Sequence, residues 1–297
     1  MDSHTGLCCL IGYPIGHSVS PQMHNTAFQA LNLNLIYLAF QVKGESLEAA
    51  VKGLKSLGVK GFNVTVPHKV SIINYLDELD DSALNVGAVN TVLNRDGELV
   101  GYNTDGRGFI KSVGIENLKD KYVTVLGAGG AARAIVYESA KYASGIFILN
   151  RTLGKAESLA REVVSRHPKI EIKAMPLTLK GVKEALEQSS LLANATIIGM
   201  HPHEDEIPIP PDLLRRDLTV FDAVYNPLKT QLLREAERLG AKTISGLDML
   251  VHQGGEAFKI WTGMNPPIQA MKDAALKALH DRRGGEELSS GRIWKVV

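Results

Sequence analysis

The stretch YVTVLGAGGAA at residues 122–132 decides the fold of this 297-residue chain. Its first five residues predict an apolar strand, and residues 131–142 predict a helix directly after a glycine-rich turn. The turn fits the G-x-G-x-x-G/A pattern, in which Gly127 makes the tight turn and Gly129 lets the backbone approach a pyrophosphate. The third small residue, Ala132, lets the helix pack close to the strand. Because the N–H groups that open a helix attract phosphate, the stretch predicts a dinucleotide-binding site.

Strand and helix patterns alternate after this turn. We expect strands at 145–149, 170–174, 195–198, 219–221 and 242–244, and helices at 155–164, 182–188 and 228–239. With the strand at 122–126, this is the element order of a Rossmann-type domain.

The first hundred residues show a similar alternation. We expect strands at 7–11, 35–42, 61–66, 88–93 and 99–102, and helices at 21–31 and 46–57. Ser20 is the expected N-cap of the first helix, with Pro21 at its first position. The chain is therefore expected to be a two-domain α/β protein, with an N-terminal α/β domain that has a mostly parallel sheet and a Rossmann-type domain.

The pattern after Gly246 is purely helical, with helices expected at 247–262 and 268–279. From His280 onward the sequence predicts a loose polar tail with an apolar end at 293–297.

Composition excludes several classes of protein. With 33 Lys and Arg against 32 Asp and Glu, the net charge of +1 gives no long-range field to gather nucleic acid or an anionic membrane. No stretch approaches the ~18 consecutive apolar residues of a membrane-spanning helix, and the start of the chain lacks the basic residues of a secretory signal. The adjacent Cys8 and Cys9 are poorly placed to pair with each other, which favours a reducing compartment. We expect a cytoplasmic monomer or homodimer without nucleic-acid or membrane partners.

The residues after the strand at 145–149 predict which dinucleotide binds. A site for NAD usually has Asp or Glu here, about 20 residues past the glycines, to bind the ribose 2′-hydroxyl. This chain has Asn150, Arg151 and Thr152 instead, with Lys155 shortly after. Guanidinium, hydroxyl and ammonium groups suit a 2′-phosphate, so the expected cofactor is NADP.

Polar side chains of the N-terminal half gather in short segments near strand ends. Two hydroxyls two residues apart, at Ser18 and Ser20, suit a carboxylate. Amide, hydroxyl, ammonium and carboxylate groups follow in three further segments, at 63–69, 90–91 and 103–105. Because ligands of open α/β sheets bind beyond the carboxyl ends of the strands, these segments are expected to converge on a small polyhydroxylated acid. His201 and His203 have no accompanying ligand set, so we expect a polar loop there and no metal.

These segments resemble the shikimate dehydrogenases, NADP-dependent enzymes that make aromatic amino-acid precursors. Eight motifs occur in the order of that family: GYPIGHSVSP at 12–21, GFNVTVPHK at 61–69, GAVNT at 87–91, GYNTDG at 101–106, the glycine turn at 127–132, NRT at 150–152, VYNP at 224–227 and GLDMLVHQ at 246–253. The resemblance covers about residues 7–279. One departure is Ile197, where the family often has Pro.

The resemblance implies a role for each matching side chain. Ser18 and Ser20 would bind the carboxylate of shikimate or 3-dehydroshikimate. The residues that would hold ring hydroxyls are Asn63, Thr65, Asn90 and Gln253, with Tyr225 nearby. The residues that would bind the cofactor are Gly127, Ala128, Gly129, Gly130, Ala131, Asn150, Arg151, Thr152, Lys155, Thr196, Gly199, Met200, Gly246 and Met249.

Lys69 and Asp105 would be the catalytic pair. Reduction of a ketone needs a hydride, which NADPH supplies, and a proton on the oxygen. As a cation, Lys69 can polarise the carbonyl and donate that proton, and Asp105 would orient it.

The architecture of the family implies a discontinuous first domain, with residues 1–105 completed by 246–297 and a cofactor domain at 106–245. Two alternatives stay open. One is a quinate/shikimate dehydrogenase that accepts both substrates or uses NAD. The other, more distant, is a non-catalytic dinucleotide-binding regulator, which would have no need of Lys69, Asp105 and the two-serine motif.

Overall fold

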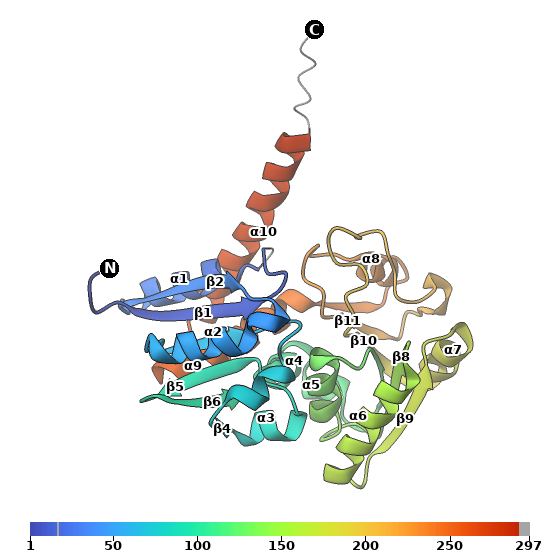
Figure 1. Ribbon diagram of the computed structural model, residues 1–297. Helices are drawn as coiled ribbons and strands as arrows, with labels where there is room; N and C mark the ends of the chain where they lie inside the picture. Colours follow the sequence, from blue (N-terminus) through green and yellow to red (C-terminus); the bar gives the residue numbers. More distant parts are fainter. Residues whose placement is uncertain (17, 291–297) are drawn as a thin grey trace.

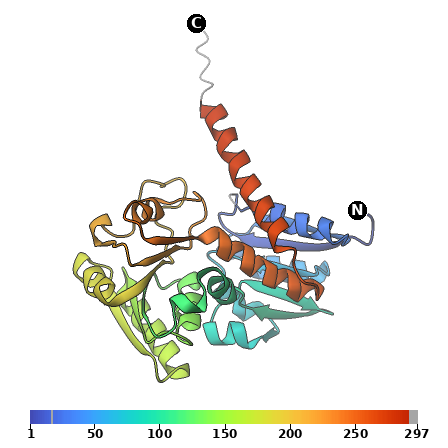
Figure 2. The same ribbon diagram turned by 180° about the vertical axis from the view of Figure 1, so that it is seen from behind.

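The computed structural model describes residues 1–16 and 18–290, with side chains as far as Asp281. Within this range the chain forms two six-stranded sheets that lie side by side, each with helices on its faces (Figure 1). Seen from behind, α9 lies against the sheet that the N-terminal half builds, and the first turns of α10 pack on α9 and α1 (Figure 2).

The first sheet has the strand order β2-β1-β3-β5-β6-β4. Only β5 runs antiparallel to its neighbours, so the sheet is mostly parallel as expected. Its strands are β1 (Gly6–Gly12), β2 (Leu35–Gln41), β3 (Gly61–Val64), β4 (Glu78–Leu79), β5 (Thr91–Arg95) and β6 (Glu98–Tyr102). The helices of this half are α1 (Ser20–Ala30), α2 (Leu47–Ser56) and α3 (Asp81–Val86). Central β1 is an apolar run and β3 is apolar except for Asn63; both are buried on both faces, which is typical of sheets covered by helices.

The second sheet is entirely parallel, with the order β12-β11-β10-β7-β8-β9. Its strands are β7 (Tyr122–Leu126), β8 (Gly145–Asn150), β9 (Glu171–Pro176), β10 (Ser189–Asn194), β11 (Thr219–Asp222) and β12 (Lys242–Ser245). The connecting helices are α5 (Gly130–Ser139), α6 (Leu153–Arg166), α7 (Leu179–Gln188) and α8 (Gln231–Arg238). This is the Rossmann order, and the order reverses between β7 and β10, where a crevice for ligands forms. The expected fold class is confirmed.

Three further helices complete the fold: α4 (Asp105–Val113) and α9 (Gly246–Thr262) lie between the two halves, and α10 (Ile268–Ser290) packs on α1 and α9. Although α9 follows the last strand of the second sheet, its Trp261 is buried in the core of the first, and the indole N–H donates to the carbonyl of Val92 at 3.0 Å. α4 packs on α9 through Gly108, where an added Cβ would lie 2.8 Å from the Cβ of Gln253. Such close approach needs glycine.

Several expected boundaries are wrong. Ser20 is the first residue of α1 and not its cap, and its own N–H is bonded to the Ser18 hydroxyl at 3.2 Å. The strand expected at 195–198 is absent from the described fold because β10 lies at 189–194. There the Asn194 side chain accepts hydrogen bonds from the N–H and hydroxyl of Thr196, which turns the chain.

Two other boundaries differ at strand and chain ends. β5 begins only at Thr91, not at residue 88. In place of a loose tail from His280, α10 continues to Ser290, and the apolar end at 293–297 lies outside the described residues.

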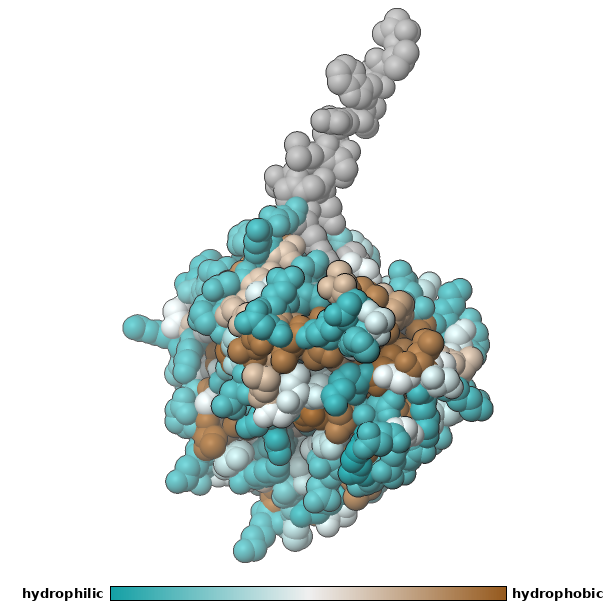
Figure 3. Space-filling view, turned by 90° about the vertical axis from the view of Figure 1, so that its left-hand side faces the viewer, coloured by the Kyte–Doolittle hydropathy of each residue, from teal (hydrophilic) through white to brown (hydrophobic). Residues whose placement is uncertain are grey.

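The edge strand β2 presents apolar side chains, with Leu38 and Phe40 exposed by 41% and 40%. The Asn25 amide of α1 donates to the carbonyl of Tyr37 at 2.9 Å and accepts from its N–H at 2.8 Å. This side-chain amide replaces a neighbouring strand at one position, which limits pairing of the edge with other chains. On the face that carries the first sheet, apolar side chains form a band between hydrophilic ones (Figure 3). None of the described helices is long and apolar enough to cross a membrane.

Asp222 ends β11 and holds the loops around the crevice. It is fully buried and accepts hydrogen bonds from the Thr230 hydroxyl at 2.6 Å, the Asn194 amide at 2.9 Å and the Val224 N–H at 3.0 Å. Thr230 also caps α8 by accepting from the N–H of Leu233. Burial raises the pKa of Asp222 from 3.8 to about 6, although the three hydrogen bonds act in the opposite direction.

The raised pKa of Asp222 predicts a pH-dependent stability. Between about pH 4 and pH 6 the folded chain keeps the proton that the unfolded chain has lost, so this group lowers stability as the pH rises. Asp222→Asn removes the titration, and its unfolding free energy should gain up to about 3 kcal/mol relative to the wild type between pH 4 and pH 7. Urea unfolding at several pH values measures this difference. The exposed turn variant Asp96→Asn is the control, and a pH-independent difference for Asp222→Asn would contradict the prediction.

Candidate active site

A cavity of about 670 Å³ lies at the carboxyl ends of strands from both sheets. The segments that line it are the loop after β3, the glycine turn after β7, the residues after β8 and the loops after β10 and β11. Twelve of the predicted site residues are among its walls: Thr65, Lys69, Gly127, Ala128, Gly129, Gly130, Ala131, Asn150, Arg151, Thr196, Met200 and Tyr225.

The glycine turn gives the cavity a wall of bare backbone. Gly127 has φ of +107°, and a Cβ there would lie 3.1 Å from the carbonyl oxygen of Ala195. At Gly129, which occupies the N-cap position of α5, nothing lies within 4 Å of the place of a Cβ. The first N–H groups of α5 open into this space, which is the arrangement that binds phosphate groups.

Asn150 ends β8 and Arg151 follows it, and both line the cavity. The Asn150 amide donates to the carbonyl of Thr152 at 2.9 Å, and Thr152 begins α6 as its N-cap. The first turn of α6 contains no acidic residue. Thr152 and Lys155 are exposed beside the cavity and do not line it, so Arg151 is the predicted phosphate ligand with the most direct access.

Lys69 and Asp105 form an ion pair at the inner end of the cavity. The Lys69 ammonium lies 2.5 Å from Oδ2 of Asp105, and the two side chains are exposed by only 17% and 6%. Lys69 belongs to the loop after β3, which is anchored because the adjacent His68 ring hydrogen-bonds the carbonyl of Val42 at 2.6 Å. Asp105 opens α4, where the helix dipole favours a carboxylate.

Asn90 connects this pair to α9. Its amide donates to Oδ1 of Asp105 at 2.8 Å and to Oε1 of Gln253 on α9 at 3.2 Å. Residues 90 and 253 are far apart in the sequence, yet four predicted site residues, Lys69, Asp105, Asn90 and Gln253, meet here through direct contacts.

The remaining predicted residues lie around this cluster. Asn63 is buried, and its amide donates to the Asn90 carbonyl at 3.1 Å. Gly246 starts α9 so close to the loop after β11 that a Cβ would lie 2.4 Å from the carbonyl oxygen of Ala223. Met249 is buried in the core of the second sheet rather than on the cavity wall. Gly199, with φ of +88°, lies between the lining residues Ile198 and Met200.

Sequence reasoning missed the apolar walls and one polar wall. The cavity is also lined by Val66, Pro67, Val70, Leu177, Ala195, Ile197, Ile198, His201, Pro202, His203, Glu206, Ala223, Val224 and Asn226. The segment 201–206 directly follows Thr196, Gly199 and Met200, which were predicted to bind the cofactor. Its place in the sequence could therefore have predicted that it lines the cavity. Among the described residues no group of three or more His, Cys, Asp or Glu could hold a metal ion.

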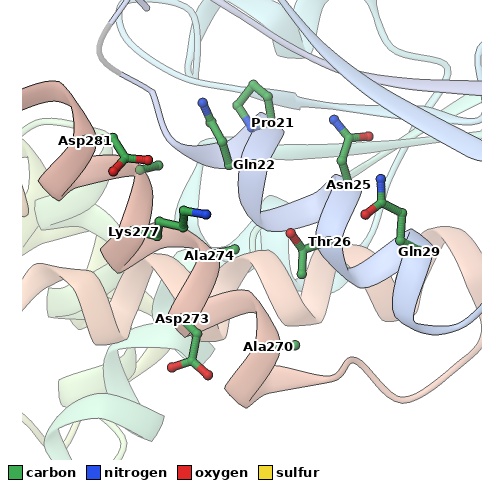
Figure 4. A pocket seen from close by; sticks show the side chains of 11 residues that line it. Pro21, Gln22, Asn25, Thr26, Gln29, Ala270, Asp273, Ala274, Lys277 and Asp281 are labelled. Atoms are coloured by element: carbon green, nitrogen blue, oxygen red, sulfur yellow. The ribbon is translucent and has the colours of Figure 1, made fainter. Parts of the chain in front are cut away.

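A second hollow lies between α1 and α10, with side chains of both helices along its rim (Figure 4). Gln22, Asn25 and Gln29 line it from α1, and Asp273, Lys277 and Asp281 from α10. None of the predicted site residues lines this hollow.

Comparisons with known proteins agree along the chain. Three family models match: the shikimate dehydrogenase substrate binding domain at residues 10–92, shikimate / quinate 5-dehydrogenase at 111–199, and the shikimate 5′-dehydrogenase C-terminal domain at 246–276. The shikimate dehydrogenase (NADP(+)) of Methanocaldococcus jannaschii is 46% identical over 284 residues, which cover 93% of this chain and 98% of that protein.

Solved structures give the same result. A shikimate dehydrogenase in complex with NADP+ has a TM-score of 0.87 and 45% identity, and the match covers 94% of this chain and 97% of that one. The shikimate 5-dehydrogenase of Listeria monocytogenes, in complex with shikimate and NAD, has a TM-score of 0.84 and 39% identity, covering 92% and 97%. The chain therefore belongs to the shikimate dehydrogenase family.

Proposed function

We propose that this chain is an NADP-dependent shikimate dehydrogenase, which interconverts 3-dehydroshikimate and shikimate. The observation that carries the proposal is the position of the Lys69–Asp105 pair beside the glycine turn. A Cβ on Gly130 would lie 3.1 Å from Cδ of Lys69, so the turn that receives a dinucleotide and the candidate acid meet in one cavity. The relatives named above support the same activity.

Lys69 and Asp105 are the proposed catalytic residues. When bound, NADPH supplies the hydride, and the chain has to orient the ketone and place a proton on its oxygen. Lys69 polarises the carbonyl and donates the proton from Nζ, because its ammonium group is fixed at the end of the cavity. Asp105 holds that ammonium group in place with Oδ2 while Oδ1 is fixed by Asn90.

The substrate would bind between these residues and the start of α1. Ser18 and Ser20 are the proposed carboxylate ligands, and Tyr225, which lines the cavity, is the proposed neighbour of the substrate. The proposed ligands of the ring hydroxyls are Asn63, Thr65, Asn90 and Gln253.

The bare backbone at Gly129 fits the cofactor diphosphate, and Arg151 fits the 2′-phosphate. The other proposed cofactor contacts come from Asn150, Thr152, Lys155, Thr196, Gly199, Met200, Gly246 and Met249. Asn150 and Arg151 stand at the end of β8, where a site for NAD usually has an acid, which favours NADP over NAD. A quinate/shikimate dehydrogenase with dual substrate or NAD use is the alternative activity. A non-catalytic regulator is disfavoured because it would not need the Lys69–Asp105 pair.

We propose the domain division 1–105 with 246–297 and 106–245. It is supported by the shared core in which Trp261 and Phe258 of α9 pack with Tyr37 of β2. Monomer or homodimer and a cytoplasmic location remain proposals; the free thiols of Cys8 and Cys9 support a reducing compartment.

Nicotinamide absorbance with shikimate and quinate, each against NADP+ and NAD+, tests the activity. We expect shikimate with NADP+ to give the highest kcat/KM. Activity only with quinate and NAD+ would overturn the proposal.

Lys69→Ala should lower kcat by about 10²–10⁴, with a much smaller change in the KM for shikimate, because it removes the proton donor. Steady-state kinetics at saturating NADP+ measures both constants. The control is Lys55→Ala, which breaks a half-exposed ion pair with Asp77 and should leave both constants unchanged. A Lys69→Ala enzyme with wild-type kcat would remove Lys69 from the chemistry.

Arg151→Ala should raise the KM for NADP+ about tenfold, because a charge-assisted guanidinium–phosphate hydrogen bond contributes about 1.5–3 kcal/mol. The KM for shikimate should change little. Any activity with NAD+ is an internal control, since NAD+ lacks the 2′-phosphate and its KM should stay constant. An equal rise in the KM for NADP+ and for shikimate would refute the role of Arg151.

A further inference from the structure

A continuous chain of buried hydrogen bonds runs from Tyr37 to the Lys69–Asp105 pair. Two of its members, Tyr37 on β2 and Thr91 on β5, have no role in the function proposed above. Both are fully buried, with no exposed surface. Tyr37 bonds one amide that the proposed function assigns to the substrate, and Thr91 stands between two of them.

Tyr37 begins the chain. Its hydroxyl donates to Oδ1 of Asn63 at 2.8 Å. The Tyr37 ring stacks on the His24 ring of α1, with the ring centroids 4.5 Å apart and an interplanar angle of 12°. Removing only the hydroxyl would therefore leave the ring in place.

Thr91 connects Asn63 to Asn90. It lies directly opposite Asn63 in the antiparallel pairing of β3 and β5, so the two side chains meet. The Asn63 amide donates to the Thr91 hydroxyl at 3.0 Å, and that hydroxyl donates to Oδ1 of Asn90 at 3.0 Å.

The direction of these bonds fixes how each amide is turned. Asn63 receives at Oδ1 from Tyr37 and donates from Nδ2 to Thr91. Asn90 receives at Oδ1 from Thr91 and from the Thr104 N–H at 2.8 Å, so its Nδ2 faces Oδ1 of Asp105. A flipped Asn90 would point its carbonyl oxygen at the carboxylate, which is repulsive. Bonds that all run in one direction also polarise one another.

We propose that Tyr37 and Thr91 are positioning residues, whose hydroxyls set the orientation of the Asn63 and Asn90 amides and thereby order both the substrate ligands and the carboxylate of Asp105. The proposal rests on the proposed function, since it concerns the same site. Tyr37 acts on the binding side through Asn63. Thr91 acts on the catalytic side through Asn90 and Asp105.

Two substitutions at Thr91 test the catalytic side. Thr91→Val keeps the shape and removes the hydroxyl, and it should lower kcat with shikimate about tenfold to a hundredfold, because it leaves buried partners unsatisfied. The KM for NADP+ should stay constant. Thr91→Ser keeps the hydroxyl and should restore kcat to within about threefold of the wild type.

The matched control is Thr124→Val. Thr124 is also a fully buried strand threonine, and its hydroxyl bonds Ser189 at 2.8 Å inside the Rossmann sheet, away from the cavity. This variant should lose thermal stability as Thr91→Val does and keep wild-type kcat and KM. Wild-type kinetics in Thr91→Val, or an equal loss in Thr91→Ser and Thr91→Val, would overturn the role of the Thr91 hydroxyl.

Tyr37→Phe tests the binding side and keeps the proposal testable if Thr91→Val does not fold. It should raise the KM for shikimate about tenfold and change kcat less. An unchanged KM for shikimate would overturn the role of Tyr37. These outcomes are separate from failure of the proposed function, which is read from the wild-type enzyme: no oxidation of shikimate by the wild type would refute the activity itself.

Discussion

The ion pair between Lys69 and Asp105 is the constraint on which the rest of the site depends. Withdrawing two opposite charges from water is costly unless further hydrogen bonds compensate. Here Asp105 gains the Asn90 amide and the first turn of α4, and Lys69 belongs to a loop anchored through His68. The hydrogen bonds of the polar cluster thus offset the cost of burying the ion pair.

The residues that position the ion pair come from distant parts of the sequence. The helix that Asp105 opens, α4, approaches two neighbouring helices closely. A Cβ on Gly106 would lie 2.3 Å from Cγ of Glu138 on α5, and Gly108 meets Gln253 on α9. α9 therefore completes the core of the first sheet and also positions Gln253, which accepts from the Asn90 amide.

The glycine turn could be predicted from local sequence, because strand, turn and helix are adjacent in the chain. Gly127, Gly129 and Ala132 each have a steric role there. Local signals failed where a side chain redirected the backbone, as at Asn194, whose bonds to Thr196 end β10 where an apolar run predicted a strand. The Lys69–Asp105 pair could be proposed from family motifs. The part played by Tyr37 and Thr91 could not, because it follows from the register of β3 against β5 and from the burial of one tyrosine.

The two sides of the cavity differ in how they prepare for a ligand. On the substrate side the amides and hydroxyls are already bonded to one another, so recognition depends on keeping a fixed arrangement. On the nucleotide side the turn presents backbone N–H groups and an open space at Gly129, and the guanidinium of Arg151 faces the same cavity. Loss of a single hydroxyl on the substrate side therefore disturbs several neighbours at once. On the nucleotide side a lost side chain removes one contact and leaves the backbone cradle intact, since no side chain builds that cradle.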